Sequence, residues 1–536
     1  MHSRRLISLA GAAWFWALVL MFVVSHANGT SDVSGDATLE FGTSTGTLWA
    51  PFLEWELENA SFAGNPFDVA ADVRFTHNEA GITHETQMFY AGSDVWRFRF
   101  TGTRTGEWVF ETSSDDPDLD GRSGFVVIEP NPDPDIHGFL VADNNRFAVQ
   151  VGEDGALRGT TYNVYYNHPA NLHIPGGWEG EGGFPVGDRA AIEEKAAAVL
   201  DEVTEHGADA MFLHVTNELF QYGARAHDEH DSETPDPDTF EVLEMIITRA
   251  HKRSLHVHMW LWGDEQRRQT PVGLPGGING RVDQRMQRYI AARLGPLPGW
   301  TMSYGFDLNE WVTPAEVGKW HDYMHEHIGW PRLLMARETQ AGHHDPFELG
   351  VNKLDVYSSD ERPSSGFYDL AVDLLQEGYP LVFERRFLHS RDDVWDMDTT
   401  RRAWWQFALA GGAGAVWGVK WADPSDARPY PNPEQLRTFR TFWRDRFLLD
   451  LKPATELTDG YALKVPGGDL AVFYKESTSS VELDLSAMSE ALTGVAVDTK
   501  LDYLEIELGD LAAEPQVWSA PYESDWAIAI GVFDAP

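Results

Sequence analysis

The sequence Trp300-Thr-Met-Ser-Tyr-Gly-Phe-Asp-Leu-Asn-Glu-Trp311 contains an apolar run that ends on the polar pair Asn309-Glu310. A second run, Tyr379-Pro-Leu-Val-Phe-Glu384, also ends on a glutamate. Both lie where strand-like and helix-like segments alternate, which is typical of a (β/α)8 barrel with its chemistry at the carboxyl ends of the strands. Two carboxylates on that face are what cleavage of a glycosidic bond requires: one protonates the leaving oxygen, and the other attacks or activates water.

The alternation extends through residues 138–450, where eight strand ends can be placed with helical segments between them, such as 189–205 and 238–254. We therefore expect an α/β fold with a (β/α)8 TIM barrel over this range. In this count the two glutamates end the fourth and seventh strands. The eight segments are 159–163, 210–214, 255–260, 302–310, 332–338, 354–357, 381–384 and 414–417.

Two β-rich regions flank the predicted barrel. In residues 36–132, short segments alternate apolar and polar side chains with period two, which predicts an N-terminal Ig-like β-sandwich. Residues 131–135, Asn-Pro-Asp-Pro-Asp, indicate a linker. The pattern returns to short strands over 451–536, which predicts a small C-terminal β-sandwich.

Composition limits the partners of this chain. Its 536 residues carry a formal net charge of −43, which excludes nucleic acid and anionic membranes as ligands because both require a basic surface. Only nine of the 41 basic residues are lysines. A carboxylate-rich, lysine-poor chain suits high salt and indicates a halophilic protein, with a GC-rich genome as the alternative. Because cysteine is absent, disulfides, thiolate catalysis and Cys-ligated zinc are excluded.

Residues 1–27 predict a signal peptide. Ser3-Arg4-Arg5-Leu6-Ile7 resembles a twin-arginine export motif, residues 6–24 are apolar, and Ser25-His26-Ala27 offers small residues for cleavage. We therefore expect a secreted, extracellular protein with no membrane contact after cleavage. An uncleaved N-terminal anchor is the alternative, since the apolar stretch is long for a signal.

The chain as a whole resembles the clan A glycoside hydrolases, whose barrel carries Asn-Glu after strand four and a nucleophilic Glu after strand seven. Asn309-Glu310 and Glu384 match those positions. The N-terminal region, with Asn65-Pro-Phe67 and Gly106-Glu-Trp108, resembles a module of unknown function that precedes many such barrels. The C-terminal region resembles a β-domain proposed to bind collagen in the same bacterial and archaeal proteins.

This resemblance implies a retaining mechanism with Glu310 as the acid/base and Glu384 as the ionised nucleophile. Asn309 would bind the sugar 2-hydroxyl, an interaction that strengthens in the transition state. The alternative for either glutamate is a structural ion pair, since Arg385 and Arg386 adjoin Glu384.

Strand three contributes a further set of candidates. Alternation places its histidines and tryptophans on one face, which predicts a sugar-contacting wall with His258 nearest the acid/base and Trp260 beside it. We include His214, which ends strand two, in the substrate-binding set. A His-x-His metal pair is the alternative, but it would leave the two glutamates without a purpose, so we expect no metal and no cofactor.

Four more side chains complete the predicted site. Tyr357 is expected to donate to Glu384, with a packed barrel tyrosine as the alternative. Trp417 is expected to be the platform under the reacting sugar, because the clan has an aromatic side chain there; a core tryptophan is the alternative. Glu338 would line a subsite, or be solvated or paired with Arg337. The pairs Arg385-Arg386 and Arg267-Arg268 would favour binding of a sulfated or carboxylated glycan, unless local carboxylates pair with these arginines.

We therefore expect a secreted retaining glycoside hydrolase that cleaves a polysaccharide or oligosaccharide by a two-glutamate double displacement. The arginine pairs extend this expectation to an anionic, sulfated or uronic glycan. Two alternatives stay open: a non-catalytic carbohydrate-binding surface protein, and a polysaccharide lyase with His258 or Tyr357 as its base. The oligomeric state is unknown from the sequence, as are the linkage and the choice of endo or exo action.

Overall fold

In the computed structural model, the described part of the chain belongs to one compact unit. The described residues are 41–160, 163–167, 187–221, 232–263, 270–305, 308–337, 354–359, 366–375, 378–384, 397–419, 433–444, 446, 450–489 and 492–533. For a few of these, His214 and Asn309 among them, only the backbone is described. The predicted signal peptide lies outside the described residues. Within the described part of the chain, no helix has both the length and the apolar character needed to cross a membrane.

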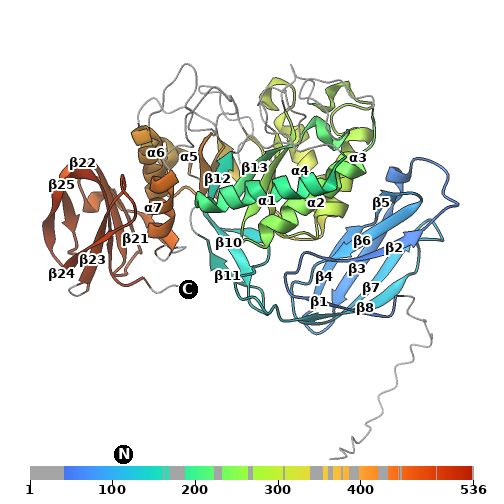
Figure 1. Ribbon diagram of the computed structural model, residues 1–536, viewed down its shortest axis with the longest axis horizontal. Helices are drawn as coiled ribbons and strands as arrows, with labels where there is room; N and C mark the ends of the chain where they lie inside the picture. Colours follow the sequence, from blue (N-terminus) through green and yellow to red (C-terminus); the bar gives the residue numbers. More distant parts are fainter. Residues whose placement is uncertain are drawn as a thin grey trace, which may run out of the picture. The chain divides into compact units, whose positions relative to one another are not determined.

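Two sheets at the N-terminus share one hydrophobic core (Figure 1). The predicted period-two pattern is present: in β3 and β6, Phe75, Phe98 and Phe100 are fully buried, while Arg74 and Arg97 on the opposite faces are more exposed. A 3-10 turn, η1 (Pro66–Asp68), precedes β3. The first sheet runs β1-β8-β7-β3-β4, with β1 (Thr43–Thr47), β3 (Ala71–His77), β4 (Ile82–Gln87), β7 (Gly106–Ser114) and β8 (Ser123–Glu129); the second runs β2-β6-β5, with β2 (Leu53–Glu58), β5 (Phe89–Gly92) and β6 (Val95–Phe100).

A small antiparallel sheet follows, which the sequence pattern did not predict. Its order is β11-β10-β9, with β9 (Leu140–Asp143), β10 (Arg146–Val151) and β11 (Ala156–Gly159). The first barrel strand was placed at 159–163, but the structure corrects this: residue 159 ends β11, and the first parallel strand is β12 (Asn163–Asn167). The two strands are three residues apart, so a single apolar pattern could not separate them.

The central element is an eight-stranded parallel sheet in the order β16-β15-β14-β13-β12-β19-β18-β17. All residues of β14 and β15 are buried, as expected for parallel strands covered on both faces. The other seven predicted strands overlap observed ones. They are β13 (Ala210–His214), β14 (His256–Trp262), β15 (Trp300–Gly305), β16 (Leu334–Met335), β17 (Tyr357–Ser359), β18 (Leu381–Phe383) and β19 (Gly414–Val419).

The two outer strands of this sheet, β16 and β17, approach each other without a continuous ladder between them. An isolated parallel bridge joins Arg337 to Ser358, and the Asp355 amide donates to the Leu334 carbonyl at 3.2 Å. The described fold is therefore a mixed α/β arrangement of eight parallel strands whose outer edges meet at a few contacts.

Helices follow the parallel strands and share a hydrophobic core with them. In α4 (Pro314–Ile328), Thr313 and Glu316 form a capping box at the start, and Gly329 ends the helix at φ 69°. A Cβ at Gly329 would lie 2.0 Å from the Glu85 carbonyl oxygen of β4, so glycine is required there for close approach as well as for φ. The other helices are α1 (Arg189–Glu205), α2 (Pro237–His251), α3 (Arg281–Leu294), α5 (Phe367–Leu374), α6 (Met397–Ala410) and α7 (Pro433–Arg444).

The C-terminal region forms one hydrogen-bonded sheet of six strands, where a two-sheet sandwich was expected. The register of β22 with β25 shifts between Lys475 and Ser480, and residues on both sides of the shift, such as Phe473 and Val481, share one core. The long strands therefore serve both halves of the module. Its order is β20-β21-β22-β25-β23-β24, with β20 (Lys452–Pro453), β21 (Tyr461–Lys464), β22 (Ala471–Asp484), β23 (Leu492–Asp498), β24 (Glu505–Leu511) and β25 (Pro515–Ile530).

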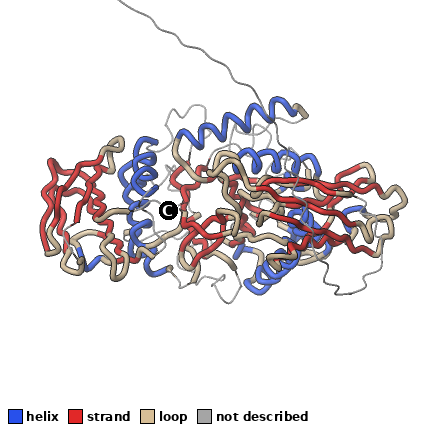
Figure 2. The backbone as a smooth tube through the Cα atoms, turned by 90° about the horizontal axis from the view of Figure 1, so that it is seen from below, coloured by secondary structure: helices blue, strands red, loops and turns tan. Residues whose placement is uncertain are grey.

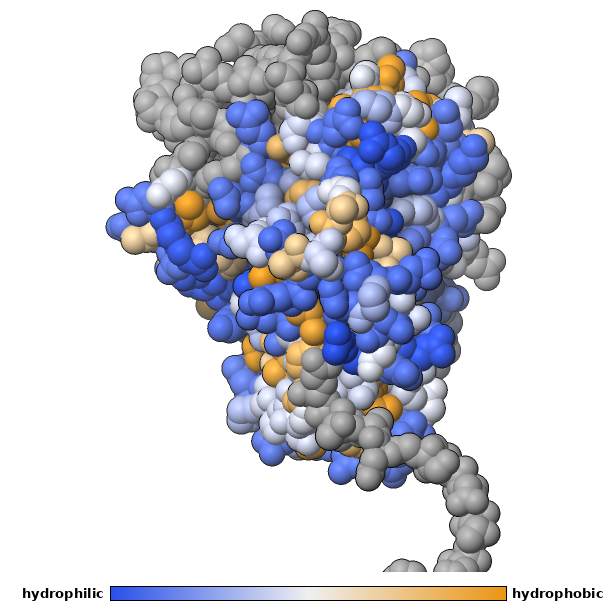
Figure 3. Space-filling model, turned by 90° about the vertical axis from the view of Figure 1, so that its right-hand side faces the viewer, coloured by the Kyte–Doolittle hydropathy of each residue, from blue (hydrophilic) through white to orange (hydrophobic). Residues whose placement is uncertain are grey.

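Helices α6 and α7 lie between this sheet and the parallel strands, as Figures 1 and 2 show. Trp405 of α6 stacks on Tyr474 of β22 with centroids 5.3 Å apart, and the buried Arg401 of α6 pairs with the buried Asp525 of β25. The face of the molecule in Figure 3 is mostly hydrophilic, in keeping with the strongly acidic composition.

Candidate active site

Glu384 follows β18 directly and is 2% exposed. Two side chains donate to its carboxylate: Trp260 Nε1 to Oε2 at 2.7 Å and Ser358 Oγ to Oε1 at 2.7 Å. Trp260 comes from β14 and Ser358 from β17, so three parallel strands fix the position of this one group. The backbone amide of Glu384 also donates to the Ser359 carbonyl at 3.1 Å.

Two basic side chains lie around the same carboxylate. His258 Nε2 is 3.7 Å from Glu384 Oε1, and its Nδ1 is 2.8 Å from the hydroxyl oxygen of Thr301 on β15. The guanidinium of Arg337 lies over the Trp260 ring, with Cζ 5.1 Å from the ring centroid. The environment of Glu384 is therefore buried and polar, with hydrogen-bond donors and positive charge directed at it.

This environment keeps Glu384 ionised. Burial by itself raises the pKa of a carboxyl group, but the proximity of His258, the charge of Arg337 and the hydrogen bond from the Ser358 hydroxyl outweigh it and bring the pKa of Glu384 below its ordinary value. A buried carboxylate that stays charged is suited to act as a nucleophile or as an electrostatic partner of a positive centre.

Glu310 lies at the same carboxyl edge of the parallel strands, in the 3-10 turn η5 (Leu308–Glu310) that follows β15. In contrast to Glu384 it is exposed. Gly305, at φ 153°, ends β15 where a Cβ would lie 2.5 Å from the Trp262 carbonyl oxygen of β14. Trp311 Nε1 donates to the Gly263 carbonyl at 3.0 Å, which anchors the turn on its other side.

The hydrogen bond to Glu384 that was predicted for Tyr357 comes instead from its neighbour Ser358. Ser358 donates to Glu384 from strand β17, whereas Tyr357 belongs to the hydrophobic cluster between the strands and the helices. Side chains of successive strand residues point to opposite faces, so the two cannot share a role. The prediction for Tyr357 was wrong because it assumed the opposite alternation along this three-residue strand.

Trp417 is a core tryptophan, which was the alternative to its predicted role. Its ring is fully buried and stacks on Trp404 of α6 at 5.6 Å, with Phe439 of α7 6.0 Å away, whereas Val416 joins the cluster inside the strands. It therefore faces the helices, which corrects the expected sugar platform. Trp262, expected on the wall with Trp260, stacks on Phe220 at the strand end.

For four of the predicted sugar-contacting residues, the structure does not describe the side chain. His214 ends β13 and Asn309 lies in η5, each with only its backbone described, so both are at the expected edge. Glu338 and Arg385 lie outside the described residues, as do Arg267 and the other predicted arginines of those pairs.

Three residues near the carboxyl ends of the strands were not among the predicted site residues. Ser358 could have been found from alternation once the phase of β17 was known, and Arg337 follows β16 at the strand position before Glu338. The third is the fully buried Glu218 in η2 (Asn217–Leu219), which follows β13 and repeats the Asn-Glu pair of strand four. A search for that dipeptide at strand ends would have identified it.

One group with metal-ligand spacing is present among the side chains that the structure describes: His321, His325 and Asp355. It lies on α4 and before β17, away from Glu384, and is taken up below. His256, which begins the predicted His-x-His pair, is buried, and burial lowers its pKa to about 3.

Comparison with known proteins identifies the N-terminal module and the fold. Residues 47–115 match the domain of unknown function DUF5060. A proposed glycoside hydrolase from Bacteroides vulgatus ATCC 8482 aligns with a TM-score of 0.69 and 16% identity over 91% of this chain and 99% of that chain.

Two further solved structures are similar. One described as a glycoside hydrolase has a TM-score of 0.53 and 13% identity over 74% of this chain and 97% of its own. A family 5 glycoside hydrolase from Bacteroides vulgatus ATCC 8482 has a TM-score of 0.51 and 12% identity over 74% and 93%. A search of curated proteins finds no match. The chain thus shares the fold of glycoside hydrolases, with a DUF5060 module at its N-terminus.

Proposed function

We propose that this chain is a secreted retaining glycoside hydrolase in which Glu384 is the nucleophile and Glu310 the acid/base. The observation that supports this most is the buried carboxylate of Glu384, which accepts from Trp260 and Ser358 and has a lowered pKa. In the proposal, the eight parallel strands close into a (β/α)8 barrel through the contacts between β16 and β17.

The two glutamates suit different steps of a double displacement. Glu384 would attack the anomeric carbon and form a glycosyl ester, while Glu310 gives its proton to the departing glycosidic oxygen. Glu310 would then take a proton from the water that hydrolyses the ester. A nucleophile must be ionised when substrate binds, which the environment of Glu384 favours; an acid/base must exchange its proton, which the exposure of Glu310 allows.

For the substrate we propose a polysaccharide or oligosaccharide, with His258 and Trp260 beside the reacting sugar. Asn309, His214, Glu338 and Arg385 are the further candidates for sugar contacts. The basis for proposing a sulfated or uronic glycan is the sequence pairs Arg267-Arg268 and Arg385-Arg386, since guanidinium groups bind such anions bidentately.

The domain limits belong to the proposal as well. We propose a signal peptide over 1–27, the DUF5060-bearing β-module over 36–132, the catalytic barrel over 138–450 and the C-terminal β-module over 451–536. Export through the twin-arginine route and function in high salt follow from the sequence features described above.

The test is an assay of the purified protein in high salt against neutral, sulfated and uronic-acid polysaccharides, read by reducing ends and by absorbance near 235 nm, roughly where unsaturated uronates absorb. We expect new reducing ends without that absorbance, and their loss in Glu310→Gln. A matched Glu316→Gln variant, in which an exposed carboxylate of the α4 capping box is changed, should stay active. Reducing ends accompanied by that absorbance would mean a lyase, and sugar binding without any product would mean a non-catalytic binding protein.

A further inference from the structure

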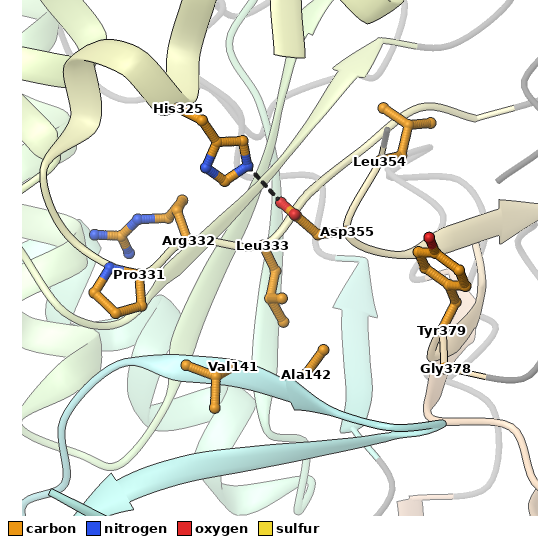
Figure 4. Close-up of a pocket in the computed structure, with 10 residues that line it drawn as sticks. All are labelled: Val141, Ala142, His325, Pro331, Arg332, Leu333, Leu354, Asp355, Gly378 and Tyr379. Atoms are coloured by element: carbon orange, nitrogen blue, oxygen red, sulfur yellow. Dashed lines mark hydrogen bonds and ion pairs between the residues drawn. The ribbon is translucent and has the colours of Figure 1, made fainter. Parts of the chain in front are cut away.

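Three side chains converge at the amino ends of the parallel strands, opposite the candidate active site. His321 and His325 are one turn apart on α4, so both imidazoles lie on the same face of the helix. Asp355 precedes β17 and meets them: its Oδ1 is 3.5 Å from His321 Nε2, and its Oδ2 is 3.0 Å from His325 Nε2. Figure 4 shows His325 and Asp355 pointing toward one another across the edge of a pocket.

We propose that His321, His325 and Asp355 bind a divalent transition-metal ion, with Zn²⁺ as the preferred occupant. Two imidazole nitrogens and one carboxylate oxygen form a donor set that zinc uses in proteins, whereas Ca²⁺ and Mg²⁺ favour oxygen ligands. One ligand atom from each residue can be chosen so that all lie within 4.8 Å of one another. Bonds of about 2.0–2.2 Å in a tetrahedron place ligand atoms roughly 3.3–3.6 Å apart. The two oxygens of Asp355 lie at similar separations, 3.5 Å from His321 Nε2 and 3.0 Å from His325 Nε2.

Contacts on the far side of His321 and Asp355 orient these two side chains toward the proposed ion. The hydroxyl of the buried Tyr304 lies 3.4 Å from His321 Nδ1, which leaves Nε2 of that ring directed at Asp355. The Leu334 amide of β16 donates to Asp355 Oδ2 at 2.9 Å. Each of the two contacts comes from a different strand, β15 for Tyr304 and β16 for Leu334.

The pocket beside the group leaves room for a further ligand. It has a volume of about 560 Å³, and His325 and Asp355 line it together with Arg332 and Tyr379. Three protein ligands and a water from this pocket would complete four-coordinate zinc.

The position of His321, His325 and Asp355 indicates a structural role for the ion. Asp355 stands where β16 and β17 meet, at the point where the ladder between these strands is interrupted. An ion held by α4 and Asp355 would tie the helix after β15 to the start of β17. Because Glu384 lies at the other ends of the strands, metal binding should change stability and leave the chemistry of the proposed hydrolase unaffected.

The experiment uses the full chain, stripped with a chelator and titrated with Zn²⁺ by calorimetry, and separately with Co²⁺ followed by its visible absorption. We expect one ion bound with the strong absorption of tetrahedral cobalt, together with a rise in the melting temperature. His325→Gln should weaken the affinity by at least about 100-fold, since loss of even an outer-shell partner costs 10–100-fold.

His327→Gln is the matched control. His327 lies on the same helix, but its Nδ1 donates to the Tyr323 carbonyl of that helix, so the metal site should keep its affinity in this variant. Because the His325 side chain is partly exposed, its variant should fold, which circular dichroism checks. Asp355→Asn provides a second test with the same expected loss. Absence of binding to the wild type, or equal affinity in His325→Gln and His327→Gln, would overturn the proposal.

Discussion

At the scale of single residues, the chemistry centres on how Glu384 is held. Sequence alternation placed His258 and Trp260 on one face of β14, with His258 expected nearest Glu310. The structure instead places both side chains beside Glu384. The partner from β17 was assigned to Tyr357 but is Ser358. A three-residue strand is too short for its phase to be read from a hydrophobic pattern, so this role could not be predicted from the sequence.

Ser358→Ala should raise the pKa of Glu384. The Ser358 hydroxyl donates to the ionised carboxylate, so its loss favours the protonated form and moves the acidic limb of the pH profile of kcat/KM to higher pH. The Ser303→Ala variant is the control, because that buried hydroxyl donates to the Gly305 carbonyl instead. An acidic limb that stays at the wild-type pH in Ser358→Ala would contradict the assigned contact.

At the scale of elements, the sequence predicted those segments best whose ends carry clear signals. Residues 210–214 and 189–205 coincide with β13 and α1, where Asp188 caps the helix. The sheet β9–β11 was missed because its strands directly precede the first parallel strand. The C-terminal β-region was expected as two sheets, since the sequence pattern does not show that β22 and β25 run through both halves.

Gly329→Ala should be strongly destabilising. Its φ of 69° costs an L-residue about 1–2 kcal/mol, and the added Cβ would overlap the Glu85 carbonyl at 2.0 Å, so the loss in free energy of unfolding should exceed that figure. Gly81→Ala is the matched control: φ is 66°, but nothing lies within 4 Å of the added Cβ. Urea denaturation of both variants measures the difference. Equal losses in the two would show that the contact between α4 and β4 has no energetic importance.

At the scale of the whole molecule, the order of β-region, alternating α/β region and β-region followed from the sequence, while the contacts between these regions did not. Arg99 of β6 donates to Glu244 of α2 at 3.0 Å, and these residues are 145 positions apart. Arg293 of α3 pairs with the same carboxylate. No local pattern marks such a buried cluster, because it depends on how separate elements meet.

Glu244→Gln should lower the free energy of unfolding by about 3–5 kcal/mol, because it leaves the buried guanidinium of Arg293 without a carboxylate and leaves Arg99 with Glu54 alone. The pKa of Glu244 is lowered: burial raises it, but Arg99 and Arg293 more than compensate. The stabilisation is therefore present above the ordinary carboxyl pKa and is lost as the pH falls through the lowered value.

The control for that variant is Glu241→Gln on the same helix, where the carboxylate and its partner Arg189 are both exposed, so a loss of about 0–1 kcal/mol is expected. Thermal and urea unfolding at neutral pH compare the two. Similar stabilities for the two variants would show that the cluster of Arg99, Glu244 and Arg293 does not stabilise the contact between the N-terminal sheets and the helices.

The measurement that tests the central proposal most directly is the turnover of Glu384→Gln on the substrate found in the polysaccharide assay, with folding checked by its melting curve. Loss of the nucleophilic carboxylate should reduce kcat by roughly 10⁴-fold or more while the protein still binds the glycan. Turnover near the wild-type rate in a folded Glu384→Gln variant would contradict the assignment of this residue and the mechanism built on it.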